Sequence, residues 1–157
     1  MTLSDYFLSP RGRIGRQEYW LGMLAMMAVT IIGASLIDPQ GFTNAGGKVR
    51  PPSFAATVWS LLFAWPTTAV SIKRFNDRDW PWWLGFALGA SMTAFVIANY
   101  NGYFLDPDGM PAIERLLMAC AAVAFTWSLF ENGFQRGTSG PNRYGPDPLD
   151  QIQGTPD

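Results

Sequence analysis

Long stretches without charged residues constrain this chain more than any other feature of its sequence. Residues 19–37 and 54–72 each contain 19 residues and no Asp, Glu, Lys or Arg. Residues 81–104 form a third uncharged run, and a shorter apolar run lies at 113–130. An α-helix rises about 1.5 Å per residue, so about 20 residues cross a hydrocarbon core of about 30 Å. The four runs therefore predict four membrane-spanning helices.

The composition favours the same conclusion. Charged residues make up 15% of the chain and hydrophobic residues 48%, whereas a soluble globular protein carries about 25% charged residues. A soluble protein with buried helices is the alternative, and three uncharged runs of this length in one small chain disfavour it. We predict an all-α, polytopic membrane protein with four transmembrane helices in a bundle, forming a single domain over residues 1–150. Residues 151–157 are expected to be a short disordered tail.

The first run is expected to stay in the mature protein. Arg11, Arg13 and Arg16 precede it, as cations precede the apolar core of a signal peptide. The apolar core of a signal peptide is about 7–15 residues long, however, and this run is longer. We therefore interpret it as an uncleaved transmembrane helix.

The positive charges predict the orientation. With four spans, one side of the membrane holds both termini and the loop between the second and third helices, and this side carries eight of the 11 Lys and Arg residues. Cations accumulate on cytoplasmic loops, so both termini are predicted to be cytoplasmic. The charge-dense residues 73–79 then form the cytoplasmic turn of a helical hairpin. The eight cations are Arg11, Arg13, Arg16, Lys73, Arg74, Arg78, Arg136 and Arg143.

Three motifs carry a resemblance to a known family. They are "GRIGRQEYW" at residues 12–20, "KRFNDRDWPWW" at residues 73–83 and "GTSGPNRYGPDP" at residues 137–148. Together they resemble the DUF805 family of small bacterial inner-membrane proteins, with Asn76 at the position where that family usually has a histidine. The resemblance implies a multi-pass protein of the bacterial inner (plasma) membrane, and the family is one of unknown function.

The three motifs are expected to meet at the cytoplasmic face as a charged polar cap. In one interpretation the cap is a brace, in which arginine forks bind carboxylates and tie the helix ends together. In the other it recognises an anionic lipid headgroup, a nucleotide or a partner segment. We expect a partly exposed salt bridge that joins the hairpin to the tail and contributes about 0–1 kcal/mol. It is expected to pair Arg74 or Arg143 with Asp77, Glu18, Glu131 or Asp147. The candidate cap or headgroup residues are Arg11, Arg13, Arg16, Glu18, Arg74, Asp77, Glu131, Asn142, Arg143 and Asp147.

Several chemistries are disfavoured. The chain has no histidine and one cysteine, Cys120, so we expect no zinc or other metal site, no cofactor and no catalytic constellation. A net charge of −1 disfavours nucleic acid as a partner. Asp106 and Asp108 are a weak candidate for a cation site, because the spacing of a calcium-binding EF-hand loop is missing.

The runs themselves leave two functions open. A non-enzymatic scaffold or binding protein working through the cap is favoured, since no charge lies mid-span to mark an ion pathway. The alternative is a small oligomeric transporter or channel, with a path lined by Pro66 and the polar residues of the second run. Gly85 and Gly89 allow close helix approach, either within one chain or, less favoured, in a homo-oligomer. Membrane lipids, including anionic ones, are the expected partners.

Overall fold

The computed structural model describes residues 1–42, 50–103 and 111–153, and its regular elements there are helices. One isolated β-bridge joins Asn142 and Gly145. Four of the helices are long and apolar enough to cross a membrane, namely α2, α3, α4 and α5. The elements are α1 (Leu3–Leu8), α2 (Arg16–Ile37), the 3₁₀ helix η1 (Pro39–Phe42), α3 (Phe54–Asp77), α4 (Trp82–Tyr100), α5 (Ala112–Phe134) and α6 (Pro148–Gln153).

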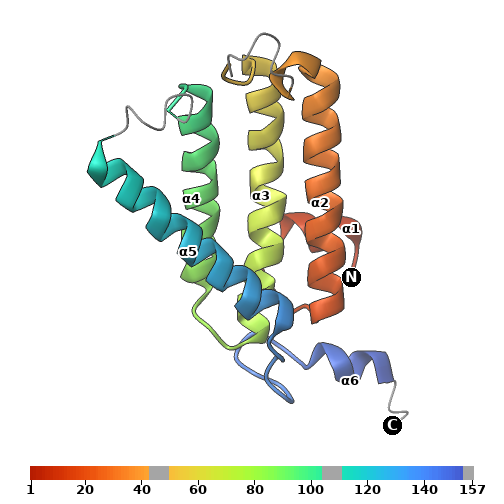
Figure 1. The fold of residues 1–157 in the computed structure, drawn as a ribbon. Coiled ribbons are helices and arrows are strands. Elements are labelled where there is room, and N and C mark those ends of the chain that lie inside the picture. Colours follow the sequence, from red (N-terminus) through yellow and green to blue (C-terminus); the bar gives the residue numbers. More distant parts are fainter. Residues whose placement is uncertain (43–49, 104–110, 154–157) are drawn as a thin grey trace.

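The four long helices form a layer of three crossed by the fourth. Figure 1 shows α2, α3 and α4 side by side, with α3 in the middle, and α5 running obliquely across them. Helix α3 packs against both neighbours and is the most buried of the four, whereas α5 contacts α2 and α3 and is the least buried. The helices α2 and α4 begin, and α3 and α5 end, at the same end of the layer (Figure 1). That end carries the polar cap.

Small residues set the distance between α3 and α4. A Cβ atom added at Gly85 would lie 2.8 Å from the backbone Cα of Ile72, and one at Gly89 would lie 2.1 Å from Oγ1 of Thr68. Both glycines therefore face α3 within the same chain, which is the favoured one of the two alternatives drawn from the sequence. Association of copies through Gly85 and Gly89 stays a prediction.

Helix α3 continues without a break through Pro66. Its hydroxyl groups donate to carbonyl oxygens one turn earlier, as in Thr68 Oγ1 to Ala64 O at 2.7 Å and Ser71 Oγ to Thr67 O at 3.0 Å. Thr57, Ser60 and Thr67 make the same kind of bond, at 3.0, 3.1 and 2.9 Å.

Helix α1 is an element that the sequence patterns did not predict. It lies against α3, where Nζ of Lys73 donates to the carbonyl of Asp5 and, at 2.7 Å, to that of Tyr6. Nε1 of Trp65 donates to the carbonyl of Leu8 at 3.0 Å. The last carbonyls of a helix lack partners within it, and a cation there complements the negative end of its dipole. Side chains of α3 thus hold the N-terminal segment against the layer of helices.

The loop regions differ from the expected boundaries at two places. Lys73–Asp77 belong to α3, so the turn between α3 and α4 is shorter than expected and passes through Asp79, which has a φ of +57°. Helix α6 reaches Gln153, so the first residues of the predicted disordered tail are helical, and 154–157 lie outside the described residues. The weak cation candidate at Asp106 and Asp108 also lies outside them.

Candidate functional site: the polar cap

The carboxylate of Asp77, the last residue of α3, is the centre of the polar cap. Its Oδ1 accepts a hydrogen bond from Nε of Arg13 at 3.0 Å, and its Oδ2 accepts one from Nη1 of Arg74. The side chains of Arg13, Arg74 and Asp77 expose 1%, 0% and 5% of their surface, respectively. Two guanidinium groups therefore share one buried carboxylate, and they come from the segment before α2 and from α3.

Arg13 connects this centre to the segment that follows α5. Its Nη1 donates to the carbonyls of Gly140 at 2.8 Å and Gly145 at 3.1 Å, and its Nη2 donates to that of Thr138 at 2.7 Å. Thr138 also binds α3 directly, since its amide donates to the carbonyl of Asp77 at 2.9 Å. One arginine thus binds three carbonyls of residues 138–145, here called the tail loop.

Arg74 closes the end of α5. Its Nε donates to the carbonyl of Asn132 at 2.6 Å, and its Nη2 donates to the carbonyl of Gln135. Carbonyls in the last turn of a helix lack partners within the helix. Arg74 supplies donors to them from a fully buried position, so it fixes where α5 ends relative to α3.

Arg74 and Asp77 form a salt bridge as expected, but both belong to α3, so this pair does not itself join the hairpin to the tail. The expectation of partial exposure is also wrong for it. Both side chains are buried because α5 and the segments around them supply further partners: Arg74 donates to the carbonyls of Asn132 and Gln135, and Asp77 also accepts from Arg13. The second arginine, Arg143, pairs instead with Asp79, with 3.0 Å between Nε and Oδ1, and that pair is about half exposed.

A glycine before the tail loop and a carboxylate after it also shape this segment. A Cβ atom at Gly137 would lie 2.0 Å from Oδ2 of Asp77, so a larger residue there would displace the buried carboxylate. Asp147 accepts hydrogen bonds from the amides of Leu149 at 3.0 Å and Gly140 at 2.9 Å. The bond from Leu149, followed by that from Gly140 and the nearby charge of Arg13, lowers the pKa of Asp147. Asp147 therefore braces the tail loop itself.

Three of the remaining candidates, Glu18, Arg16 and Glu131, make contacts at the ends of helices. Glu131 pairs with Arg78, and Glu18 accepts a hydrogen bond from the amide of Gly15 at 2.8 Å at the start of α2. Arg16 donates to the carbonyl of Phe134 at 3.2 Å. Arg11 is exposed, and its guanidinium has no hydrogen-bond or ion-pair partner within the described part of the chain.

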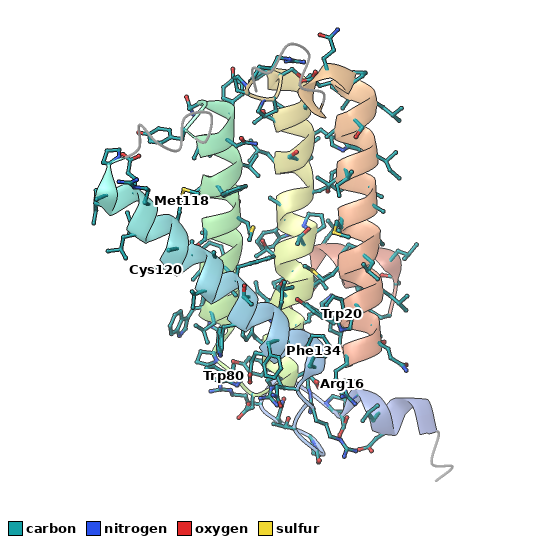
Figure 2. The ribbon with its side chains drawn as sticks, in the orientation of Figure 1. Arg16, Trp20, Trp80, Met118, Cys120 and Phe134 are labelled. Atoms are coloured by element: carbon teal, nitrogen blue, oxygen red, sulfur yellow. The ribbon has the colours of Figure 1, made fainter. Side chains whose placement is uncertain are left out.

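Aromatic side chains pack beside these polar contacts where α2 begins and α5 ends. Figure 2 shows Arg16, Trp20 and Phe134 gathered there. The rings of Trp20 and Phe134 have centroids 5.7 Å apart, and Nε1 of Trp20 donates to the carbonyl of Gly133 at 3.0 Å. Trp20 therefore fastens α2 to α5 just above the cap.

Two cap residues were not selected from the sequence. Nδ2 of Asn76 donates to the carbonyls of Pro10 at 3.2 Å and Gly12 at 3.1 Å, and so holds the turn before α2. Thr138 receives a bond from Asn142 at 3.0 Å in addition to its contacts with Arg13 and Asp77. Both lie within the quoted motifs, at residues 73–83 and 137–148, but neither is charged, and every predicted cap residue except Asn142 is charged.

Two cavities flank the buried centre. A cavity of about 200 Å³, here called the mixed-charge cavity, lies between the start of α2 and the tail loop, and its lining includes Arg16, Arg136, Glu18 and Asp147. A second cavity of about 380 Å³, here called the arginine cavity, is lined by Arg11 and Arg143 and by no acidic residue. The mixed-charge cavity is lined by charges of both signs, whereas the arginine cavity is lined by cations and is therefore suited to an anion.

The cap holds the chain segments around it in fixed positions through ion pairs and hydrogen bonds. Its buried carboxylate accepts from two cations, and its arginines mostly donate to carbonyl oxygens. Over the described ranges, no group of three or more His, Cys, Asp or Glu side chains is placed to hold a metal ion.

The chain is similar to one protein family and to two proteins of Escherichia coli. The family described as "Protein of unknown function (DUF805)" matches residues 7–146. The uncharacterized protein YiiR of Escherichia coli is 27% identical over 157 residues, covering 96% of this chain and 92% of its own length. The inner membrane protein YhaH of Escherichia coli is 27% identical over 139 residues, covering 88% and 85%, respectively. No solved structure matches this chain.

The match of the family over most of the chain agrees with the four apolar helices and with the three motifs that build the cap. The protein is an integral membrane protein and belongs to the DUF805 family.

Proposed function

We propose that this chain is a non-enzymatic binding protein of the bacterial inner membrane, which holds a ligand at the cytoplasmic face through its polar cap. The observation that carries the proposal is the buried network of Arg13, Asp77 and Arg74. It joins the segment before α2, the end of α3 and the tail loop, and these segments form walls of both cavities. A site whose walls are fixed in advance binds with less loss of conformational entropy.

Stability alone is a weak reason for such a network. Removing charges from water costs several kcal/mol per ion, and replacing a buried ion pair with well-packed apolar residues is often neutral or stabilising. Here the ions are buried at the cap end of a layer in which α3 already packs against α2 and α4. A role in positioning the tail loop for binding accounts for charges that packing does not require.

The transporter alternative has less support. It relied on Pro66 and on polar residues of the second span, but α3 continues through Pro66 and its Ser and Thr hydroxyls donate to its own backbone. Both cavities described above lie at the cap.

The proposed orientation makes a prediction for topology reporters. Tags at the two termini are expected to be cytoplasmic, and tags inserted at Gly46 and Gly109 are expected to be external, because the cap end carries most of the cations. Accessibility of each tag to a membrane-impermeant reagent in intact and opened cells measures this. An external C-terminus would contradict a cap that faces the cytoplasm.

The binding proposal predicts a ligand that depends on the cap. Native mass spectrometry of the full chain, released from membranes in a mild uncharged detergent, is expected to show wild type with a retained small-molecule or lipid adduct. Arg13→Gln is expected to lose the adduct, because it removes the contacts to Asp77 and to three tail-loop carbonyls. Arg115→Gln, an exposed change at the far end of α5, is the matched control and is expected to retain it.

Thr138→Val gives a milder second test, since it preserves every charge and the side-chain volume but removes the hydroxyl that bonds Arg13 and Asn142. A wild-type protein without any adduct, or equal retention in all four proteins, would contradict a binding role for the cap.

A further inference from the structure

The arginine cavity is the part of the cap whose charge is not balanced by its own lining. It has a volume of about 380 Å³ and lies among the turn before α2, the end of α3, the start of α4 and the tail loop. Two of its residues are cations and none is acidic. Its lining includes Arg11, Ile72, Asn76, Trp82, Arg143 and Tyr144.

Both arginines have donors to offer. The guanidinium of Arg11 has no partner within the described residues. Nε of Arg143 lies 3.0 Å from Oδ1 of Asp79, and its Nη2 donates to the carbonyl of Asp79 at 2.6 Å. The two side chains are 56% and 45% exposed, however, and such surface pairs contribute only about 0–1 kcal/mol. A phosphate oxygen pair matches the guanidinium fork better than a single carboxylate oxygen does. The lining is thus complementary to a phosphate group.

The backbone under each arginine is braced. Asn76 donates from Nδ2 to the carbonyls of Pro10 and Gly12, on either side of Arg11, at 3.2 and 3.1 Å. The guanidinium of Arg143 lies over the ring of Tyr144, 4.9 Å from its centroid, and the hydroxyl of Tyr144 donates to the carbonyl of Trp80 at 2.9 Å. Asn76 and Tyr144 therefore act as positioning residues for two cations that come from opposite ends of the sequence.

The rest of the lining is apolar and lies where α4 enters the membrane. Ile72 is buried on the last turns of α3, and Trp82 is the first residue of α4, with 56% of its surface exposed. Indole side chains favour the boundary between headgroups and hydrocarbon. A soluble phosphate compound would gain nothing from these two residues, whereas the glycerol and upper acyl region of a lipid would pack against them.

We propose that the arginine cavity binds the headgroup phosphate of an anionic phospholipid, held between Arg11 and Arg143. The inference rests on the proposed binding role of the cap and specifies its site and ligand class. Of the three arginines near the N-terminus, only Arg11 is assigned to this site. Arg13 is paired in the buried network, and Arg16 lines the mixed-charge cavity.

The test is a titration of the purified full chain, in uncharged detergent at low salt, with three probes. These are short-chain phosphatidylglycerol, short-chain phosphatidylcholine and inorganic phosphate, measured by isothermal titration calorimetry. Wild type is expected to bind phosphatidylglycerol more tightly than the other two, because the choline cation is repelled and free phosphate lacks the apolar contacts. The double variant Arg11→Gln with Arg143→Gln is expected to bind phosphatidylglycerol about twenty-five-fold more weakly, from about fivefold per cation near a lipid surface.

Control variants distinguish binding at this site from nonspecific attraction of an anionic lipid to positively charged residues. Both substituted side chains are exposed, so the fold is expected to persist, and each single variant is expected to lose about fivefold. Arg115→Gln is expected to bind as wild type does. Unchanged binding in the double variant would overturn the assignment of the cavity. Equal affinity for inorganic phosphate and phosphatidylglycerol would overturn the lipid as its source.

The two proposals fail differently. If the double variant retains its ligand while Arg13→Gln loses it, the cap binds elsewhere and only the arginine cavity is refuted. If wild type binds no phosphatidylglycerol but carries another cap-dependent adduct in native mass spectrometry, the inference again fails and the binding role stands. If no protein of the series carries or binds a ligand, both are refuted.

Discussion

Asp77→Asn is expected to lower the free energy of unfolding by about 3–5 kcal/mol, the cost of removing one partner of a buried ion pair. The substitution keeps the shape of the side chain but leaves the buried guanidinium groups of Arg13 and Arg74 facing a neutral amide. Chemical denaturation of the purified protein in mild detergent, followed by circular dichroism, measures the change. The tail loop is also expected to become accessible to protease, because Asp77 positions the guanidinium of Arg13, which binds the carbonyls of that loop.

Asp79→Asn is the matched control for this prediction. It removes the same charge two residues later, from a pair with Arg143 that is about half exposed, so the expected cost is about 0–1 kcal/mol. Similar costs for Asp77→Asn and Asp79→Asn would show that the cap is solvated and that the buried network does not hold the tail loop.

Gly85→Leu is expected to destabilise the helix layer by about 3 kcal/mol, the upper part of the range for overpacking a filled site. The reason is that even a Cβ atom at this position would meet the backbone of Ile72 at 2.8 Å, so α3 and α4 must separate. The same unfolding measurement is used, with Ala87→Leu on the exposed face of α4 as the control. A larger loss at Ala87 than at Gly85 would indicate that the exposed face, through contacts between copies, is the more tightly packed.

The spans could be predicted from the sequence because the membrane sets their length. A helix in lipid must keep about 20 residues apolar, and this requirement is visible in the sequence without knowledge of neighbouring helices. The predicted runs at 19–37, 54–72, 81–104 and 113–130 correspond to α2, α3, α4 and α5, although three of these helices extend further into the cap. The meeting of the three motifs could also be predicted, because four spans place both termini and the loop after the second span on the same side of the membrane.

The partners of the cap arginines could not be predicted in the same way. Arg13 and Arg74 donate largely to backbone carbonyls, which every residue carries and which leave no mark in the sequence. The six-residue helix α1 is too short to show a periodicity, and its end is completed by Lys73, 67 residues away from Tyr6.

The sequence by itself determined that this chain crosses a membrane four times and collects its charges at one end, because hydrophobic length and charge are properties of single segments. The tertiary structure alone decided which charges are buried and which stay exposed. Arg13 and Arg11 are two residues apart and look alike in the sequence, yet Arg13 is closed in by the tail loop whereas Arg11 faces a cavity beside Arg143. That difference arises from contacts between segments more than 100 residues apart, such as the one from Arg13 to Gly140, and only the folded chain brings them together.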